Sequence, residues 1–193
     1  MKKSKIGLIR HGETDWNKAK RSQGHSDIPL NHAGKQQAHR VGERLTNETW
    51  DLIYSSDLQR AQQTAEIIQQ YTNLPHYIDP RLRERHGGKI EGTTETERIK
   101  KWGESWQTLD LGIESDEQIN ERGLSFFTDI TKIHYPKNIL IVSHGSFLKR
   151  ILRTLLPAEP VNVSLENCSL TVLTTTQTTW QLKLHNDIKH MVE

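Results

Sequence analysis

Short, uniformly apolar runs alternate along this chain with longer segments whose apolar residues recur at helical spacing. The run at 5–10 is typical of a strand that is buried on both faces, and the runs at 51–55 and 139–143 also predict strands, the latter most clearly. Strands that alternate with helices predict an α/β protein with a mostly parallel sheet and helices on both faces. The runs at 170–175 and 180–184 alternate in polarity, so they are expected to close the sheet as an antiparallel pair.

The helical segments are expected at 31–45, from about 57 to 71, at 116–133 and at 147–156. Asn31 is the expected N-cap of the first, Ser56 or Asp57 of the second, and Pro157 ends the last. A short strand is expected at 76–78.

The segment from about 83 to 112 differs from the rest and predicts a loop followed by one amphipathic helix. We expect it to form a small, cap-like excursion from a single domain that spans residues 1–193. Trp102 and Trp106 are four residues apart there, which would place them on one helix face. We favour the interpretation that the two tryptophans pack in an apolar core. The alternative is that they belong to a rim of the site that selects substrates.

Charge and cysteine content exclude several classes of function. Lys and Arg number 26 against 24 Asp and Glu, so we expect no nucleic-acid partner and no basic membrane face. The single cysteine, Cys168, cannot form an internal disulfide and is expected to be a small buried side chain. The apolar run after the basic N-terminus is closed by Arg10, so it does not resemble a signal peptide, and we expect a cytoplasmic protein.

Basic side chains follow the strands, at the edge of a parallel sheet where ligands bind. Arg10 and His11 follow the first strand, His144 and Gly145 follow the strand at 139–143, and Arg60 stands in the first turn of a helix after 51–55. Two imidazoles, two guanidiniums and helix N-termini together suit a phosphoryl dianion.

These residue types also predict a reaction. A neutral imidazole is a competent nucleophile, and neighbouring guanidiniums keep it neutral. Its attack on phosphorus would give a phosphohistidine, with the other cations stabilising the equatorial oxygens and no metal or other cofactor required. Glu84 is a candidate proton donor for the leaving alkoxide, although the residue type alone favours a solvated loop charge.

Five blocks of this sequence, in order, resemble the histidine phosphatase superfamily, the phosphoglycerate mutase-like proteins. They are Leu8-Ile9-Arg10-His11-Gly12-Glu13-Thr14 with Trp16-Asn17; Ser22-Gln23-Gly24 with Asp27, Pro29-Leu30 and Gly34; Ser55-Ser56-Asp57-Leu58-Gln59-Arg60-Ala61 with Thr64-Ala65; Leu82-Arg83-Glu84 with Glu91-Gly92; and Val142-Ser143-His144-Gly145. The resemblance covers the chain from Ile6 to about Leu152. It implies a three-layer α/β sandwich around a six-stranded sheet.

The resemblance also implies roles for individual residues. It makes His11 the phosphorylated nucleophile and Glu84 the proton donor. The rest of the phosphate pocket would be Arg10, Arg60 and His144, with Asn17, Gln23, Gly24 and Gly145 lining it. The ligand would be a small phosphorylated substrate or inorganic phosphate. His86 is expected to lie no closer to the site than the rim of the pocket. The remaining histidines are expected to have surface or structural roles.

The family contains phosphatases and mutases, and three functions stay open at this point. A phosphatase is favoured, because family mutases are generally longer and because no paired-arginine segment of the mutase kind is visible. The alternative is a cofactor-dependent phosphoglycerate mutase, since the sequence Glu84-Arg85-His86-Gly87-Gly88 is close to the corresponding motif of family mutases. In addition, Ile90 stands where phosphatases commonly have an aromatic residue, and Ser146 stands where they commonly have a second glycine. A non-catalytic phosphate-binding module is the third possibility. The natural substrate and the oligomeric state are not readable from the sequence.

Overall fold

A mixed six-stranded sheet organises the part of the chain that the computed structural model describes, residues 3–161, 164–176 and 179–191. The strands follow the order β3-β2-β4-β1-β5-β6. Their bounds are β1 (Ser4–Arg10), β2 (Leu52–Ser55), β3 (His76–Ile78), β4 (Ile139–Ser143), β5 (Leu170–Thr175) and β6 (Trp180–Asp187). The first four strands pair in parallel, and β5 and β6 add antiparallel at one edge. The predicted mostly parallel sheet with an antiparallel edge is therefore confirmed.

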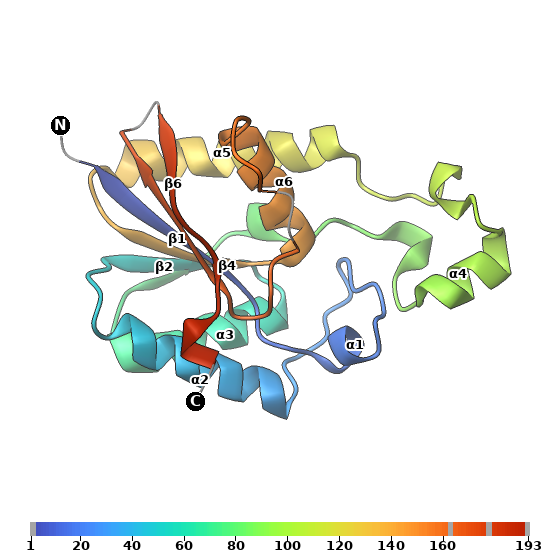
Figure 1. Ribbon diagram of the computed structural model, residues 1–193, viewed down its shortest axis with the longest axis horizontal. Helices are drawn as coiled ribbons and strands as arrows, with labels where there is room; N and C mark the ends of the chain where they lie inside the picture. The colour runs from blue at the N-terminus through green and yellow to red at the C-terminus, as the bar shows by residue number, and fades with distance from the viewer. Residues whose placement is uncertain (1–2, 162–163, 177–178, 192–193) are drawn as a thin grey trace.

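Helices cover both faces of this sheet (Figure 1). α2 (His32–Leu45) and α3 (Gln59–Thr72) lie on one face, and α5 (Asp116–His134) and α6 (Gly145–Leu155) lie on the other. Each face has its own apolar core. The core under α5 and α6 contains Phe126 and Phe147, and the core under α2 and α3 contains Val41 and Ile68. This arrangement is the expected three-layer sandwich.

The register of β1 and β4 brings the two predicted histidines together. Arg10 pairs with Ser143 at the ends of these parallel strands, so the residues that follow them are neighbours. The backbone N–H of His11 donates to the carbonyl of Ser143 at 2.9 Å. His144 therefore lies beside His11 because adjacent parallel strands end at the same level.

The helix starts differ in part from the sequence-based expectation. Asn31 caps α2 as predicted, with its side chain accepting from the Gly34 N–H. The prediction of Ser56 or Asp57 as the cap of α3 is wrong: Leu58 is the N-cap residue, without a side-chain hydrogen bond. Asp57 instead forms an ion pair with Arg83 at 2.6 Å.

Helix α6 begins at Gly145, earlier than the expected 147, and β6 extends to Asp187 rather than ending at 184. The tip between β5 and β6 includes residues 177–178, which lie outside the described residues, as do residues 1–2 and 192–193 of the expected domain. The structure adds α1 (Asp15–Lys18), whose capping box joins Thr14 and Asn17, and the single turns η1 (Pro80–Leu82) and η4 (Lys189–Met191).

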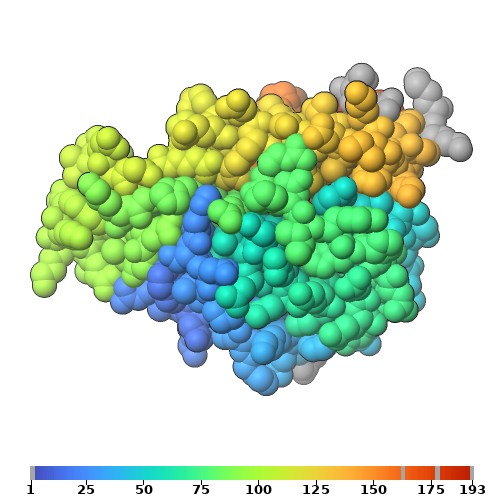
Figure 2. Space-filling view, turned by 180° about the vertical axis from the view of Figure 1, so that it is seen from behind, coloured from blue at the N-terminus to red at the C-terminus, as the bar shows by residue number. Residues whose placement is uncertain are grey.

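The segment 83–112 projects from one end of the sheet, beside α1 (Figures 1 and 2). It contains η2 (Gly88–Ile90), α4 (Glu95–Trp102) and η3 (Trp106–Thr108). Gly103, at a φ of 85°, ends α4, so the expectation that Trp102 and Trp106 share one helix face is wrong. The two side chains nevertheless belong to one small apolar cluster, together with Ile90 and Leu111.

Candidate active site

A cavity of about 600 Å³ lies where β1 ends, between the sheet and the segment 83–112. Most of the predicted site residues line it: Arg10, His11, Asn17, Gln23, Gly24, Arg60 and Glu84. His144 lies behind this wall, fully buried, with its ring centroid 5.2 Å from that of His11. Gly145 lines an adjoining cavity instead.

The ring of His11 is held in one tautomer. Its Nδ1 lies 2.7 Å from the carbonyl oxygen of Gly12, which can only accept, so Nδ1 carries the proton and Nε2 keeps its lone pair. The backbone N–H of Gly12 donates in turn to Thr64 Oγ1 at 3.1 Å. The nucleophilic nitrogen of an imidazole is thus available, and a buried hydroxyl fixes the backbone that orients it.

Both histidine rings are neutral at physiological pH. Burial lowers the pKa of His11 well below its usual value, and the charges of Arg60 and Arg10 lower it further. Burial likewise lowers the pKa of His144 well below its usual value, with Arg60, His11 and Arg10 adding to the effect. Within the described residues, neither ring nitrogen of His144 has a hydrogen-bond partner.

Arg60 is fully buried and anchored by main-chain carbonyls. Its terminal nitrogens donate to the carbonyls of Ser26 and Gly24, each at 2.8 Å. Burial lowers the pKa of Arg60 to about 10, against the opposing effect of Glu84, so the guanidinium stays charged at neutral pH. Arg10 donates to the Leu165 carbonyl at 2.6 Å.

Several buried polar atoms near the cavity lack a partner among the residues that the structure describes. They include the Nε atoms of Arg10 and Arg60, both ring nitrogens of His144 and Oε1 of Gln23. A buried donor without an acceptor costs roughly 1–3 kcal/mol. Guanidinium donors left in this condition beside one cavity fit an anionic, multi-oxygen ligand such as a phosphoryl group.

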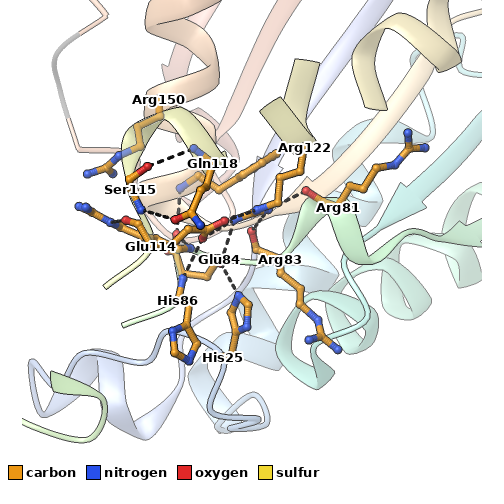
Figure 3. A network of polar contacts seen from close by, with 12 residues as sticks. His25, Arg81, Arg83, Glu84, His86, Glu114, Ser115, Gln118, Arg122 and Arg150 are labelled. Carbon is orange, nitrogen blue, oxygen red and sulfur yellow. Dashed lines mark hydrogen bonds and ion pairs between the residues drawn. The ribbon is translucent and has the colours of Figure 1, made fainter. Parts of the chain in front are cut away.

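Glu84 lies at the N-terminus of α6 (Figure 3). Its carboxylate accepts from the backbone N–H groups of Phe147, Ser146 and Arg85 at 2.9, 3.1 and 2.8 Å. The N-cap residue of α6, His144, makes no side-chain capping bond, so Glu84 supplies that interaction from a distant segment. The solvated loop charge favoured by residue type alone is therefore wrong.

The main chain at Glu84 is held from two sides. His25 Nε2 lies 2.8 Å from its carbonyl oxygen, and Arg122 donates to the same oxygen at 3.1 Å (Figure 3). Arg122 also donates to the carbonyls of Arg81 and Arg83 and pairs with Glu114 at 2.7 Å. Sequence reasoning missed both supports, because each is a contact between remote segments that leaves no local pattern.

Glu91 is a further residue that the roles inferred from sequence left out. Its carboxylate accepts from the backbone N–H groups of His25, Ser26 and Gly87, each at 2.9 Å. Gly24 belongs to the same loop: a Cβ at this position, where φ is 51°, would lie 2.1 Å from a Glu91 oxygen. The signal was present in the Glu91-Gly92 block, which carried no assigned role.

The remaining pocket residues have distinct surroundings. Asn17 lines the cavity, and its Oδ1 accepts from the Thr14 N–H at 3.1 Å. Trp106 lines the cavity with 7% of its surface exposed, whereas Trp102 does not line it. His86 is exposed and does not line the cavity. Cys168 is buried, as expected, and burial raises the pKa of its thiol.

In the described part of the chain, no group of three or more His, Cys, Asp or Glu side chains could hold a metal ion. No helix among the same residues is long and apolar enough to cross a membrane.

Comparison with known proteins decides the family. The family model of the histidine phosphatase superfamily (branch 1) matches residues 6–188. The chain belongs to that superfamily. Curated relatives of this superfamily member include the uncharacterized phosphatase PhoE of Bacillus subtilis, 33% identical over 96% of both chains. A metal-independent phosphoserine phosphatase of Arabidopsis thaliana is 34% identical over 97% of this chain and 83% of its own. A Yersinia pestis protein named as a probable phosphoglycerate mutase, GpmB, is 38% identical over 91% and 86%.

Solved structures of the family share the fold over nearly the whole length. Bacillus stearothermophilus YhfR superposes with a TM-score of 0.87 at 31% identity, covering 98% of this chain and 100% of its own. Phosphoserine phosphatase from Entamoeba histolytica, in complex with 3-phosphoglyceric acid, has a TM-score of 0.82 at 30% identity, with the same coverage. The predicted superfamily and its α/β fold are therefore confirmed.

Proposed function

We propose that this histidine phosphatase is a metal-independent phosphomonoesterase that acts on small phosphorylated metabolites through a phosphohistidine intermediate. The observation that carries the proposal is a neutral His11 with its Nε2 lone pair available, beside two guanidiniums whose buried Nε atoms have no partner among the residues that the structure describes. The relatives named for phosphatase activity, one of them metal-independent, support the same reaction class.

In the first step, His11 Nε2 forms a bond to phosphorus while the bond from phosphorus to the ester oxygen breaks. Arg10 and Arg60 supply positive charge to the equatorial oxygens, and the neutral ring of His144, whose centroid lies 5.2 Å from that of His11, can donate a hydrogen bond there. Asn17, Gln23 and Gly24 complete the wall around the phosphoryl group, and the N–H of Gly145 at the start of α6 adds a donor.

The leaving alkoxide takes its proton from Glu84. Glu84 must carry that proton when the ester bond breaks, and it lines the same cavity as His11. In the second step the carboxylate accepts a proton from water, the water oxygen bonds to phosphorus, and the bond to His11 breaks. This step releases inorganic phosphate and regenerates neutral His11 and protonated Glu84.

We further propose that residues 1–193 form one catalytic domain in which the segment 83–112 covers the site. Trp106 and Ile90 place apolar surface from this segment on the cavity wall. This location suits a wall that contacts the alcohol part of a substrate.

The test is phosphate release from a panel of phosphorylated metabolites with EDTA present. EDTA-insensitive release is expected, and a labelled substrate with rapid quenching should trap an acid-labile phosphoenzyme. His11→Ala should abolish both the phosphate release and the phosphoenzyme. His39→Ala should preserve both, because His39 lies on α2 and contacts Tyr71 of α3. Full activity in His11→Ala would contradict the mechanism, and activity lost to EDTA would contradict the metal independence.

The second candidate is a phosphoglycerate mutase. The similarity to GpmB and the sequence Glu84-Arg85-His86-Gly87-Gly88 favour it. A mutase must retain the phosphoryl group and exclude water during its transfer to a second hydroxyl. Assaying mutase activity in parallel, with and without a bisphosphate primer, separates the two, and binding without any turnover would identify a non-catalytic module.

A further inference from the structure

A single arginine on α5, Arg122, holds the loop that carries Glu84 (Figure 3). Its Nη1 donates to the carbonyls of Arg81 and Arg83 at 2.7 and 2.8 Å, and its Nη2 donates to the carbonyl of Glu84 at 3.1 Å. Its Nε and Nη2 also donate to the two carboxylate oxygens of Glu114, at 2.7 and 2.9 Å. A guanidinium has five N–H donors, so all of them are in use.

This loop depends on side-chain donors because residues 83–87 have no regular secondary structure. The carbonyls of an irregular segment have no ladder partner, and a buried acceptor without a donor costs free energy. The Leu82 carbonyl accepts from the hydroxyl of Ser143 at 2.7 Å, so the carbonyls of the successive residues 81–84 are all held by side chains. Arg122 donates to three of these four carbonyls, and the main-chain path into the proposed proton donor is therefore set from α5.

The same guanidinium also contacts the helix turn that binds the Glu84 carboxylate. It lies 4.9 Å from the ring centroid of Phe147, which is fully buried in the first turn of α6. The backbone N–H of Phe147 is one of those that donate to the carboxylate of Glu84, at 2.9 Å. Arg122 therefore contacts both the main chain that carries the Glu84 side chain and the helix that holds its far end.

Arg122 does not line the cavity that Glu84 and His11 share, so it can affect the reaction only through other residues. Its charge is one possible route: burial lowers the pKa of His144, and the charge of Arg122, among others, lowers it further. Its hydrogen bonds are the other route. A lysine at this position would keep the positive charge but has three donors and no planar guanidinium, so it separates the two routes.

We propose that Arg122 is a positioning residue for the proton donor and holds the Glu84 carboxyl in reach of the leaving oxygen of the ester. The inference rests on the proposed phosphatase function, because it assumes that Glu84 gives a proton to that oxygen as the bond from phosphorus to oxygen breaks. A general acid must lie within hydrogen-bond reach of the atom that it protonates. A displaced carboxyl cannot make this transfer, whereas the attack of His11 on phosphorus does not require it.

Leaving-group dependence distinguishes this role from a general effect on the fold. An alkyl phosphate has a poor leaving group that needs the proton, whereas a nitrophenyl phosphate releases a stable anion that needs it far less. Arg122→Lys should lower the rate of phosphoenzyme formation at least about tenfold with the alkyl ester and less than about threefold with the nitrophenyl ester. The matched control is Arg44→Lys, which changes an arginine of α2 paired with Asp187 on the other face of the sheet, and it should change neither rate.

The double variant Glu84→Gln, Arg122→Lys tests the connection between the two residues. Glu84→Gln alone should slow the alkyl ester selectively. If Arg122 acts through Glu84, adding Arg122→Lys should cause little further loss with that ester. Losses that multiply, or equal slowing of both esters by Arg122→Lys, would overturn the proposal.

Hydrogen exchange gives a measurement that needs no turnover. The N–H groups of Ser146 and Phe147 lie in the first turn of α6, where they have no partner within the helix, and both donate to the Glu84 carboxylate. A displaced carboxylate would leave them open to solvent. Arg122→Lys should therefore raise exchange at these two positions severalfold and leave exchange in β4 nearly unchanged, and unchanged exchange at 146 and 147 would contradict the proposal.

Glu114→Gln is the milder variant to use if Arg122→Lys does not fold. It keeps the arginine and replaces one oxygen acceptor of the guanidinium by an amide, so it should give the same selective loss and the same rise in exchange, both smaller. In that case, folded Glu114→Gln protein that shows neither effect would overturn the proposal. Absence of turnover by the wild-type protein with either ester would instead contradict the proposed function, because the exchange result does not depend on turnover.

Discussion

The chemistry of the site depends most on the protonation of His11. A proton on Nε2 would remove the lone pair that the proposed attack requires. Because burial, Arg60 and Arg10 hold the pKa of His11 well below its usual value, the ring should stay neutral as the pH falls through about 6.5.

NMR titration of the His11 ring measures this directly, with the signal assigned by its loss in His11→Ala. The ring should not titrate until the pH is well below 6.5, and any loss of activity at higher pH must then come from other groups. A His11 signal that titrates at the ordinary histidine value would contradict the buried, cation-flanked environment.

Thr64 controls the orientation of His11 through the backbone. Its hydroxyl accepts from the Gly12 N–H and donates to the Arg60 carbonyl at 2.7 Å. Thr64→Val should leave the Gly12 N–H unpartnered, while the Arg60 carbonyl keeps its helical bond within α3, and should cost roughly 1–3 kcal/mol of stability. Thr64→Ser keeps the hydroxyl and loses a buried methyl, at about 1 kcal/mol.

The two variants therefore have similar stability but different chemistry. We expect kcat/KM to fall about tenfold in Thr64→Val and to stay near wild type in Thr64→Ser. Urea unfolding and steady-state kinetics on the same preparations provide the comparison. Equal activity in both variants would show that the hydroxyl does not position the nucleophile.

At the scale of elements, Glu91 joins the loop at 22–26 to the segment 83–112. Burial raises the pKa of Glu91, but hydrogen bonds from Ser26, His25 and Gly87 outweigh it and lower the pKa overall. The same loop supplies the Gly24 and Ser26 carbonyls that hold Arg60. We therefore expect Glu91 to be a positioning residue for the Arg60 guanidinium.

Glu91→Gln should place an amide against backbone donors and loosen this loop. We expect kcat/KM to fall about tenfold, while Glu97→Gln, which changes an exposed capping carboxylate on α4, should have little effect. A double-mutant cycle with Arg60→Lys tests the connection. If Glu91 acts through Arg60, the double variant should lose little more than Arg60→Lys alone, and additive losses would contradict this.

How far the sequence predicts these elements depends on the range of the contacts involved. The meeting of His11 and His144 was predictable, because it needs only two buried parallel strands and the residues that follow them. The capping of α6 by Glu84 was not, since it joins residues some sixty positions apart. The error at Trp106 has a local cause, because Gly103 was not recognised as the end of α4.

At the scale of the whole molecule, burial of two neutral histidines makes stability depend on pH. The folded-state pKa of His11 and of His144 lies below the unfolded value, so below about pH 6.5 the unfolded chain binds more protons than the folded one. Stability should therefore fall as the pH drops through that value and gain nothing from these rings above it.

Urea unfolding midpoints from neutral to mildly acid pH measure this slope. Replacing both rings, as in His11→Gln with His144→Gln, should flatten the slope that they contribute. Carboxylates such as Glu91, whose pKa is lowered, lose their contribution only at more acid pH, so they do not mask the effect. An unchanged slope in the double variant would show that other groups dominate.

The segment 83–112 has its own small apolar cluster, separate from the two cores on the sheet. Trp106 is central to it: the indole N–H donates to Glu95 at 2.8 Å, and Arg98 stacks 4.9 Å from the ring. A segment stabilised by few buried side chains can open without unfolding of the sheet. Trp106→Ala should therefore raise hydrogen exchange at 88–112 while leaving exchange in β1 and β4 nearly unchanged.

The same substitution should alter substrate preference, because Trp106 also lines the cavity. Trp102→Ala removes a tryptophan from the same cluster but not from the cavity wall, so it should raise local exchange without the change in preference. Ratios of kcat/KM across substrates with small and large alcohol groups measure this. If both variants alter local exchange and neither alters the ratios, the cluster serves packing alone; a change in the ratios confined to Trp106→Ala assigns this wall to the alcohol part of the substrate.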